Sequence, residues 1–495
     1  MTPPPFLDEP DLRRWRACPR LHWLHRQGAA PTGQPPRVAD SAEAAVALRA
    51  SYAGAREIAA PRDEDDWDRA VAQTQLALAE LSARPDPEAA LLGACLASDD
   101  GARCRIDVMQ RGARGWRLWR LRLGTVADAP DVDALAWAAH VAARAGWRLQ
   151  SVGLLLIDTD FLYPGLGCYA GLFREVDVGP MLGSRPVAEW LVALQRGAQG
   201  REPPMPLVAP CAADGGCAYA DHCHAGEPAP AAVPPAQALE ILGRERAEQL
   251  RLAGHRSVLD VPLQALAEPR LRRAARAVQQ GAPVREPGVA ALAAHWPRPW
   301  RFLRIETIGL AVPIWSGTRP YQILPFQWTL GEATADGGWT LQQHLAEGQS
   351  DPRTDFVQRL LAALPPGGTL FAYQAGFERN RLRELAQRVP AQAARLEALA
   401  AGLVDVFALG RAHAYHPDQA GSWSARALWR AVLPGLGAQA LDEPGLRSPL
   451  QAYGLSLRAD TPPARRAALR AALARHGERQ VRALQAYLAW LIEAG

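Results

Sequence analysis

Residues 211–223 read Cys211-Ala-Ala-Asp-Gly-Gly-Cys217-Ala-Tyr-Ala-Asp-His-Cys223, and this cysteine triplet decides how the chain is organised. The whole chain has only 7 cysteines in 495 residues, so three of them within one short segment point to a common role. Thiolates on short, glycine-containing loops can converge on one soft metal ion or cluster. We expect Cys18 to be the fourth ligand, because the other three cysteines lie in apolar segments.

The spacing of the triplet favours a 4Fe–4S cluster. Zinc sites usually have tighter Cys-x2–4-Cys pairs, whereas an iron–sulfur cluster tolerates one remote cysteine and a looser triplet. Zinc, or buried cysteines without a metal, are the alternatives. If Cys18 is the fourth ligand, the metal or cluster joins the two ends of residues 1–225 into one domain.

The composition is that of an ordinary soluble globular protein, with 48% hydrophobic and 21% charged residues. The length allows two or three domains. No apolar run reaches the roughly 18 residues that a membrane helix needs, and the first residues lack the pattern of a signal peptide. With few, clustered cysteines, we expect a protein of the reducing cytoplasm without membrane contact.

The net charge of +4 is too small to predict a polyanionic partner by itself. All 55 basic residues are arginine. No reaction of this protein can therefore use a lysine ammonium as a base or as a positioning cation.

The first 225 residues predict an α/β domain with a central sheet. Helical patterns are followed by alternating segments that are typical of half-buried strands, and then by a further helix and strand. The expected helices are 11–18, 41–48, 66–81 and 134–145, and the expected strands are 104–109, 115–123 and 151–158. The helical pattern continues after Cys18, where Pro19 is expected to break or kink the helix.

This order, with one cysteine near the start and three at the end, resembles RecB-like PD-(D/E)XK nucleases that carry an iron–sulfur clasp. The resemblance implies a restriction-endonuclease-type sheet with an Asp on one strand and Glu-x-Lys on the next, of which the two acids bind the catalytic metal. Asp107 matches the first acid. The next strand carries Arg120-Leu121-Arg122 where Glu-x-Lys is expected.

A guanidinium stays protonated and cannot bind a divalent cation. We therefore expect this site not to hydrolyse nucleic acid. Arg120 and Arg122 either lie on the solvated face of a strand or bind a phosphate group as bidentate donors.

Residues 226–298 predict a connector between two domains. It begins with a Pro/Ala-rich spacer over 226–236, and helices are expected over 236–253 and 269–280. The second helix carries Arg270, Arg272, Arg273 and Arg276. We interpret this charge run as a solvated face rather than a nucleic-acid contact.

Residues 299–495 are similar to the DEDD-type, RNase H-like exonuclease-like half of a bacterial domain-of-unknown-function family. That family joins this half to an iron–sulfur RecB-like half. The resemblance is carried by Phe302-Leu-Arg-Ile-Glu306-Thr, by Gly317-Thr-Arg-Pro-Tyr-Gln-Ile-Leu-Pro-Phe-Gln-Trp328, by the segment that begins at Phe377-Glu378, and by Gly421-Ser-Trp-Ser424.

DEDD-type exonucleases hold two metal ions with four carboxylates. Glu306 and Glu378 are acids at matching positions, whereas Arg304 and Gln480 replace the first and last Asp. His476 stands where the family has a Tyr. Asp405 is a possible third carboxylate, although an Asp that caps a strand end explains it better.

Both candidate catalytic sites have thus lost acids, and Mg²⁺ or Mn²⁺ is not expected to bind. The favoured function is a nuclease-derived protein that binds DNA or RNA, or a nucleoprotein, without cutting it. The alternatives are an active metal-dependent nuclease and a structural or regulatory subunit of a nucleic-acid-processing complex.

Overall fold

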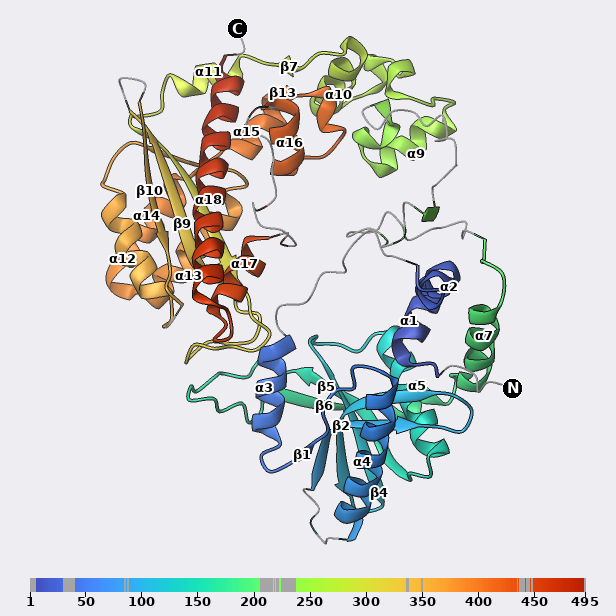
Figure 1. Cartoon of the computed structure of the whole chain (residues 1–495). Coiled ribbons are helices and arrows are strands. Elements are labelled where there is room, and N and C mark those ends of the chain that lie inside the picture. Colours follow the sequence, from blue (N-terminus) through green and yellow to red (C-terminus); the bar gives the residue numbers. More distant parts are fainter. Residues whose placement is uncertain are drawn as a thin grey trace. The chain divides into compact units, whose positions relative to one another are not determined.

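The computed structural model describes residues 6–29, 41–83, 86, 89–204, 217, 219, 222–223, 237–334, 338–348, 350–433, 435, 441, 446 and 448–493. The chain divides into two compact units, each a mixed α/β body. Unit 1 comprises Met1–Glu227 together with Gly309–Gln322, and unit 2 comprises Pro228–Ile308 together with Ile323–Gly495. Each unit is described by itself below (Figure 1).

Unit 1 contains a six-stranded sheet whose spatial order follows the sequence. Strands β1 and β2, and strands β4 and β5, are parallel, and the other neighbours are antiparallel. The expected strands of this domain are confirmed as β3, β4 and β5. The bounds are β1 (Arg56–Glu57), β2 (Ala90–Ala97), β3 (Arg103–Gly112), β4 (Gly115–Arg122), β5 (Leu149–Ile157) and β6 (Phe173–Asp177).

Helices cover both faces of this sheet. The main core packs one face against α4 and α5, and two smaller clusters pack the other face against α3. The helices of unit 1 are α1 (Glu9–Ala17), α2 (Pro19–Arg26), α3 (Ser41–Ser51), α4 (Glu64–Ala83), α5 (Ala129–Arg144), α6 (Gly179–Leu182) and α7 (Val187–Gln199).

The expected helix break at Pro19 is confirmed. Asp8 caps α1 in a capping box with Asp11, and the helix ends at Cys18, whose backbone is extended. Pro19 then occupies the first turn of α2, where its missing N–H costs no hydrogen bond. Cys18 therefore sits buried at the corner between two helices.

A loop from the second half of the sequence completes unit 1. Residues Gly309–Gln322 connect β8 and β9 of unit 2, yet they pack in unit 1. The backbone of Tyr163 accepts a hydrogen bond from Gly317 (2.8 Å) and donates one to Thr318 (3.0 Å). Val312 is 1% exposed and lies in the same apolar cluster as Tyr163. The loop is therefore part of this unit's core and not a surface excursion.

The connector between the sheets differs in detail from expectation. Gly243, with a φ of 96°, separates a 3-10 turn from α9, so the expected helix 236–253 is two elements. Helix α10 begins with Pro269 in its first turn, as expected. Its elements are η3 (Leu239–Leu242), α9 (Arg244–Leu252), η4 (Val258–Asp260), η5 (Leu263–Ala265), α10 (Pro269–Gln280), β7 (Val284–Arg285) and α11 (Gly288–Ala293).

The arginine run of α10 is largely engaged within unit 2. Arg273 is only 5% exposed and binds Glu286 through two hydrogen bonds (3.0 and 2.8 Å). Arg272 donates to the Leu266 carbonyl oxygen (3.2 Å). The expectation of a solvated face is therefore wrong for Arg273, which packs inside the unit.

Unit 2 has a five-stranded sheet of order β10-β9-β8-β11-β12. Strand β8 is antiparallel to β9 and parallel to β11. The small pair β7–β13 lies apart from it. The strands are β8 (Trp300–Ile308), β9 (Leu324–Ala333), β10 (Trp339–Leu345), β11 (Thr369–Ala372), β12 (Val404–Asp405) and β13 (Ala414–Tyr415).

Each face of this sheet has its own apolar cluster. Leu303 and Ile305 of β8 pack against α12, α13 and α14, whereas Phe302 packs with α11, α16 and the long helix α18 (Figure 1). The helices are α12 (Arg353–Ala363), α13 (Gly376–Arg388), α14 (Ala393–Gly402), α15 (Val406–His413), α16 (Ala425–Val432), α17 (Pro449–Leu457) and α18 (Pro463–Ile492), with the 3-10 turns η6 (Pro390–Gln392) and η7 (Pro417–Gln419). Within the described parts of the chain, no helix combines the length and apolarity that crossing a membrane requires.

Candidate functional site

Strand β8 presents Arg304 and Glu306 on one face. Successive side chains of a strand point to opposite faces, so residues two apart share a face. Phe302 belongs to the cluster beneath α18, and Leu303 belongs to the cluster on the other side. Arg304 and Glu306 therefore lie on the side of the sheet that α18 covers, where the sequence places a lost metal site.

Arg304 lies between two carboxyl groups. Its Nε donates a hydrogen bond to Glu306 Oε1 at 2.8 Å, and its NH1 atom is 3.8 Å from Glu378 Oε1. The charge of Glu306, and to a smaller extent that of Glu378, raises the pKa of the guanidinium above its usual value. The group that stands between these acids is thus a permanent cation that belongs to the chain.

Glu378 is a buried carboxyl group in the first turn of α13. It is 1% exposed, and neither of its carboxyl oxygens accepts a hydrogen bond from another described residue. Burial raises its pKa to about 7, although the positive charge of Arg304 opposes this shift. Near neutral pH the group therefore exists in both its protonated and its ionised forms.

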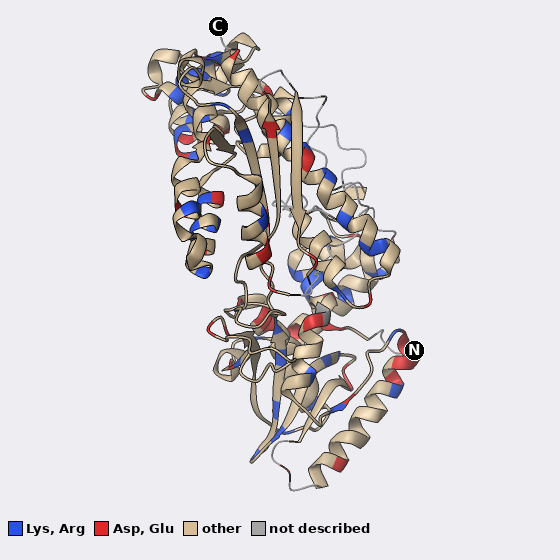
Figure 2. Ribbon diagram, turned by 90° about the vertical axis from the view of Figure 1, so that its left-hand side faces the viewer, with Lys and Arg blue, Asp and Glu red and all other residues tan. Residues whose placement is uncertain are grey.

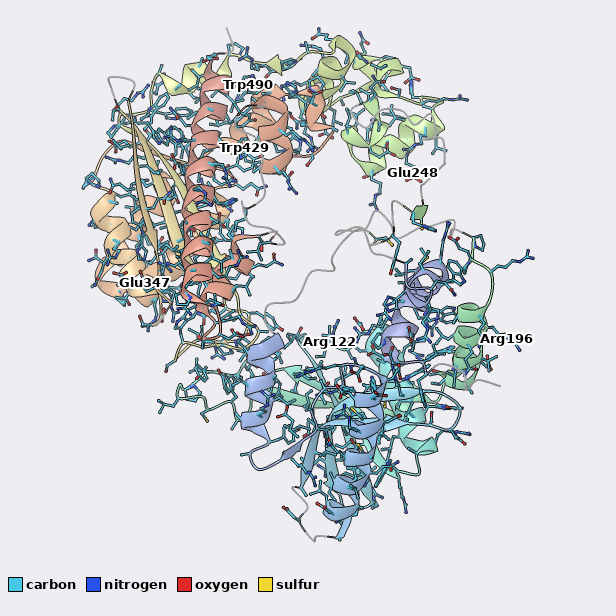
Figure 3. The ribbon with its side chains drawn as sticks, in the orientation of Figure 1. Arg122, Arg196, Glu248, Glu347, Trp429 and Trp490 are labelled. Atoms are coloured by element: carbon cyan, nitrogen blue, oxygen red, sulfur yellow. The ribbon has the colours of Figure 1, made fainter. Side chains whose placement is uncertain are left out.

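Three of the four expected positions are close together. The contacts given above bring together Arg304, Glu306 and Glu378. His476 of α18 lies beside them, with its Nε2 3.7 Å from Glu306 Oε1. The Gln480 side chain instead accepts a hydrogen bond from Trp429 Nε1 at 3.5 Å. Trp429 lies on α16, beside α18 (Figure 3).

Asp405 has a structural role of its own. It caps α15, where its Oδ1 accepts hydrogen bonds from the backbone N–H groups of Phe407 (3.0 Å) and Ala408 (3.4 Å). This agrees with its interpretation as a capping residue. Its charge still contributes to the raised pKa of Glu378.

Asp107 of β3 lies in a separate hollow of unit 1, with a volume of about 330 Å³. Its Oδ2 accepts a hydrogen bond from the Leu121 N–H at 2.8 Å, and burial raises its pKa. The residues of β4 and its end that line the hollow are Leu121 and Leu123. Asp107 therefore faces two leucines and has no second carboxylate on β4 to complete a metal site.

The two arginines of β4 have carboxylate partners elsewhere. Arg120 binds Glu9 of α1 at 2.6 Å, and Arg122 lies 3.4 and 3.3 Å from Asp128 and Asp131 at the start of α5 (Figure 3). They alternate with the leucines, so they belong to the opposite face of the strand. This differs from the expectation that arginines replace the acids beside Asp107, and it leaves the two guanidinium groups paired with protein carboxylates.

The expected cysteine ligands lie partly within the described residues. Cys18 is buried, Cys217 and Cys223 are partly exposed, and Cys211 lies outside the described residues. Residues on either side of the expected cluster are in contact. Arg20 binds Glu202 at 2.6 Å, and Glu202 also contacts His222 at 3.0 Å.

One described hydrogen bond in this region is of the kind that iron–sulfur clusters have. The Sγ of Cys217 accepts a hydrogen bond from the Tyr219 N–H at 3.5 Å, and N–H donors to sulfur are what tune such clusters. Tyr219 also donates from its hydroxyl group to the carbonyl oxygen of Ala29, just beyond α2. Cys18, Cys211, Cys217 and Cys223 would hold the cluster, which would supply a cross-link between α2 and the end of unit 1.

In the parts of the chain that the structure describes, no three or more His, Cys, Asp or Glu side chains come together in a group that could hold a metal ion. Glu306, Glu378 and His476 do not form such a group, since Arg304 stands among them.

Comparison with known proteins gives one match. Residues 301–424 match a family described as a domain of unknown function (DUF2779). This segment contains Arg304, Glu306, Glu378 and Asp405. No curated protein and no solved structure matches the chain.

Sequence reasoning missed the residues that line the Asp107 hollow. The alternation of β4 was a usable signal: Trp119 and Leu121 are apolar at odd positions, and Arg120 and Arg122 are charged at even ones. Whether the odd- or the even-numbered side chains of β4 face Asp107 depends on the register between β3 and β4. That register, with Val108 opposite Trp119, is set by the tertiary structure.

Proposed function

We propose that this chain is a nuclease-derived protein that binds nucleic acid and does not hydrolyse it. The observation that carries the proposal is the position of Arg304, whose guanidinium lies between Glu306 and Glu378. Two-metal hydrolysis needs a cage of carboxylates around divalent cations. A guanidinium in that cage repels a metal ion and cannot activate water.

The proposal includes the nuclease family from which each unit is derived. Unit 1 is proposed to be a RecB-like, restriction-endonuclease-type domain with a 4Fe–4S clasp, and unit 2 an RNase H-like domain related to DEDD exonucleases. The convergence of Arg304, Glu306, Glu378 and His476 supports the second assignment. Asp107 in a hollow supports the first, with Leu121 and Leu123 from β4 and its end beside it; Glu57, the other acid of the hollow, is paired with Arg49.

Nucleic acid is the proposed partner because the architecture derives from enzymes that act on it. Acidic and basic residues are interspersed over both units (Figure 2), so binding is proposed to use local sites and not one broad basic surface.

The proposal is tested with the purified chain, Mg²⁺ or Mn²⁺, and labelled single- and double-stranded DNA and RNA. The expected result is a gel shift at low salt, where phosphate contacts are strongest, without cleavage. Cleavage that is abolished by Glu306→Ala or Asp107→Ala would overturn the proposal in favour of an active nuclease. Absence of any shift at low salt would favour a structural or regulatory subunit.

A further inference from the structure

A second hollow, in unit 2, lies at the start of β8, which is the end away from Glu306. It has a volume of about 530 Å³, and its lining includes Arg298, Trp300, Phe302, Gln485 and Leu488. Trp300 and Arg304 are four residues apart on one strand, which corresponds to about 13 Å, and neither Arg304 nor Glu306 is among the residues that line the hollow. The hollow is therefore distinct from the lost metal site, although α18 passes over both.

One wall of this hollow is a planar, positively charged stack. The guanidinium carbon of Arg298 lies 3.7 Å from the ring centre of Trp300, which is a close cation–π contact. Arg298 has no hydrogen-bond or ion-pair partner among the described residues, and it is the only charged residue among those that line the hollow. The outer face of this guanidinium is thus available to a flat ligand and to an anion.

The rest of the hollow combines an apolar floor with one amide group. Phe302 and Leu488 are each 1% exposed and form the floor. The Gln485 side chain has no hydrogen-bond partner within the described chain, and it carries both a donor and an acceptor. Such a group can bond to the polar edge of a flat ring that lies on the floor.

We propose that this hollow binds one unpaired nucleobase together with its adjoining phosphate. The base stacks on Arg298 and Trp300, Gln485 bonds its edge, and the guanidinium also attracts the phosphate. Bases of every type stack on aromatic and guanidinium planes, so the site is a single-strand contact without strong sequence preference. The inference rests on the proposed function and assigns to it a particular contact with single-stranded nucleic acid.

The test measures binding of the full chain to fluorescein-labelled dT12 and rU12 by anisotropy, at low and physiological salt. Stacking is worth about 1–3 kcal/mol per base, so Arg298→Ala is expected to weaken binding about tenfold or more, and Gln485→Ala less. The matched control is Arg482→Ala, since Arg482 also stacks on a tryptophan, Trp339, but does not line the hollow. Melting curves check that each variant is folded.

The outcomes separate the two proposals. If the unaltered protein binds neither oligonucleotide, the proposed function fails. If it binds, but Arg298→Ala and Gln485→Ala bind as well as Arg482→Ala does, the site assignment alone fails. A second arm uses AMP and UMP as competitors: displacement only at far higher concentration than unlabelled dT12 supports a strand contact, whereas equal potency overturns it in favour of a free nucleotide.

Discussion

At the scale of single residues, Arg304 is an internal cation held by two carboxyl groups. The two oxygens nearest to it, from Glu306 and Glu378, are the kind of ligand that hard divalent cations prefer. The guanidinium neutralises the charge of the two carboxylates, as a metal ion would do. Unlike a metal ion, it has no open coordination position for water or substrate. Under the proposed function, this one residue maintains the fold of the site in place of metal chemistry.

Arg304→Ala should expose the latent affinity of this site for metal. The variant leaves Glu306 and Glu378 without their cation, and we expect a loss of about 2 kcal/mol, less than for a fully buried pair because Arg304 is 36% exposed. Thermal unfolding with and without Mn²⁺ measures the effect. Mn²⁺ should raise the melting temperature of Arg304→Ala and not that of the unaltered chain.

The control for this experiment is Arg359→Ala. Arg359 pairs with Asp355 on the exposed surface of α12, so its loss should change stability by less than about 1 kcal/mol and create no response to Mn²⁺. An equal Mn²⁺ shift in all three proteins would contradict the role given to Arg304.

Glu378 should make the stability of the protein depend on pH. Its pKa is about 7 in the folded chain, against an ordinary value of 4.5, so the folded state holds the proton more tightly than the unfolded state. The corresponding stabilisation is complete below about pH 4.5 and is lost as the pH rises to about 7. The shift corresponds to about 3 kcal/mol.

Glu378→Gln should therefore flatten the pH dependence between pH 5 and 7 and raise the stability at pH 8. Denaturant unfolding across this range measures both effects. Glu384→Gln is the control, because Glu384 lies on the same helix but is half exposed and paired with Arg381. If Glu378→Gln leaves the slope unchanged, the carboxyl group is ionised throughout this range.

At the scale of elements, α2, which begins directly after Cys18, contacts the segment that leads to the cysteine triplet. The α2 side chain of Trp23 donates a hydrogen bond to the Gly200 carbonyl oxygen at 2.9 Å, and Gln27 donates to that of Ala198 at 3.1 Å. Helix α2 is thus bound along its length to the segment that leads to the triplet. A cluster at this point would cross-link two segments about 200 residues apart in sequence.

The clasp is tested by iron content and absorbance of an anaerobic preparation. We expect about four irons per chain, the number in one 4Fe–4S cluster, and a loss of most of this iron in Cys18→Ser. Cys168→Ser is the control, since Cys168 is not an expected ligand. Its expected apolar environment is wrong, because the side chain is exposed, whereas Cys95 and Cys104 are buried as expected. One zinc per chain in the unaltered protein would establish the alternative metal.

At the scale of the whole molecule, the loop Gly309–Gln322 shows that the two units are not consecutive pieces of sequence. The loop leaves β8 two residues after Glu306 and returns at β9. A fragment that ends at residue 227 lacks Val312, which is buried in the cluster with Tyr163 and Tyr169. The first unit therefore depends on a segment from the second half of the chain.

We expect the fragment 1–227 to be less stable than unit 1 in the full chain, and a synthetic peptide of residues 309–322 to raise its melting temperature. The stabilisation comes from the burial of Val312 and from the two backbone hydrogen bonds between the loop and Tyr163. A peptide with Val312→Asp is the control, because it would bury a charge without a partner. Equal effects of the two peptides would show that the loop contributes no specific packing.

Features that depend on local pattern could be predicted from the amino-acid sequence. The alternation of apolar and polar residues predicted β3, β4 and β5, and Pro19 predicted the break between α1 and α2. The family resemblance assigned Glu306 and Glu378 to one site, and both contact Arg304. These features follow from periodicity, from the fixed geometry of proline and from residue type, all of which are local properties of the sequence.

Which side chains lie next to one another could not be predicted in this way, because it depends on tertiary packing. The pairing of β3 with β4 set Leu121 and Leu123, and not Arg120 and Arg122, beside Asp107. Packing also placed residues 309–322 in unit 1, and it turned Gln480 toward Trp429. Register and packing depend on contacts between residues far apart in sequence, because a shift of one residue reverses every side chain of a strand.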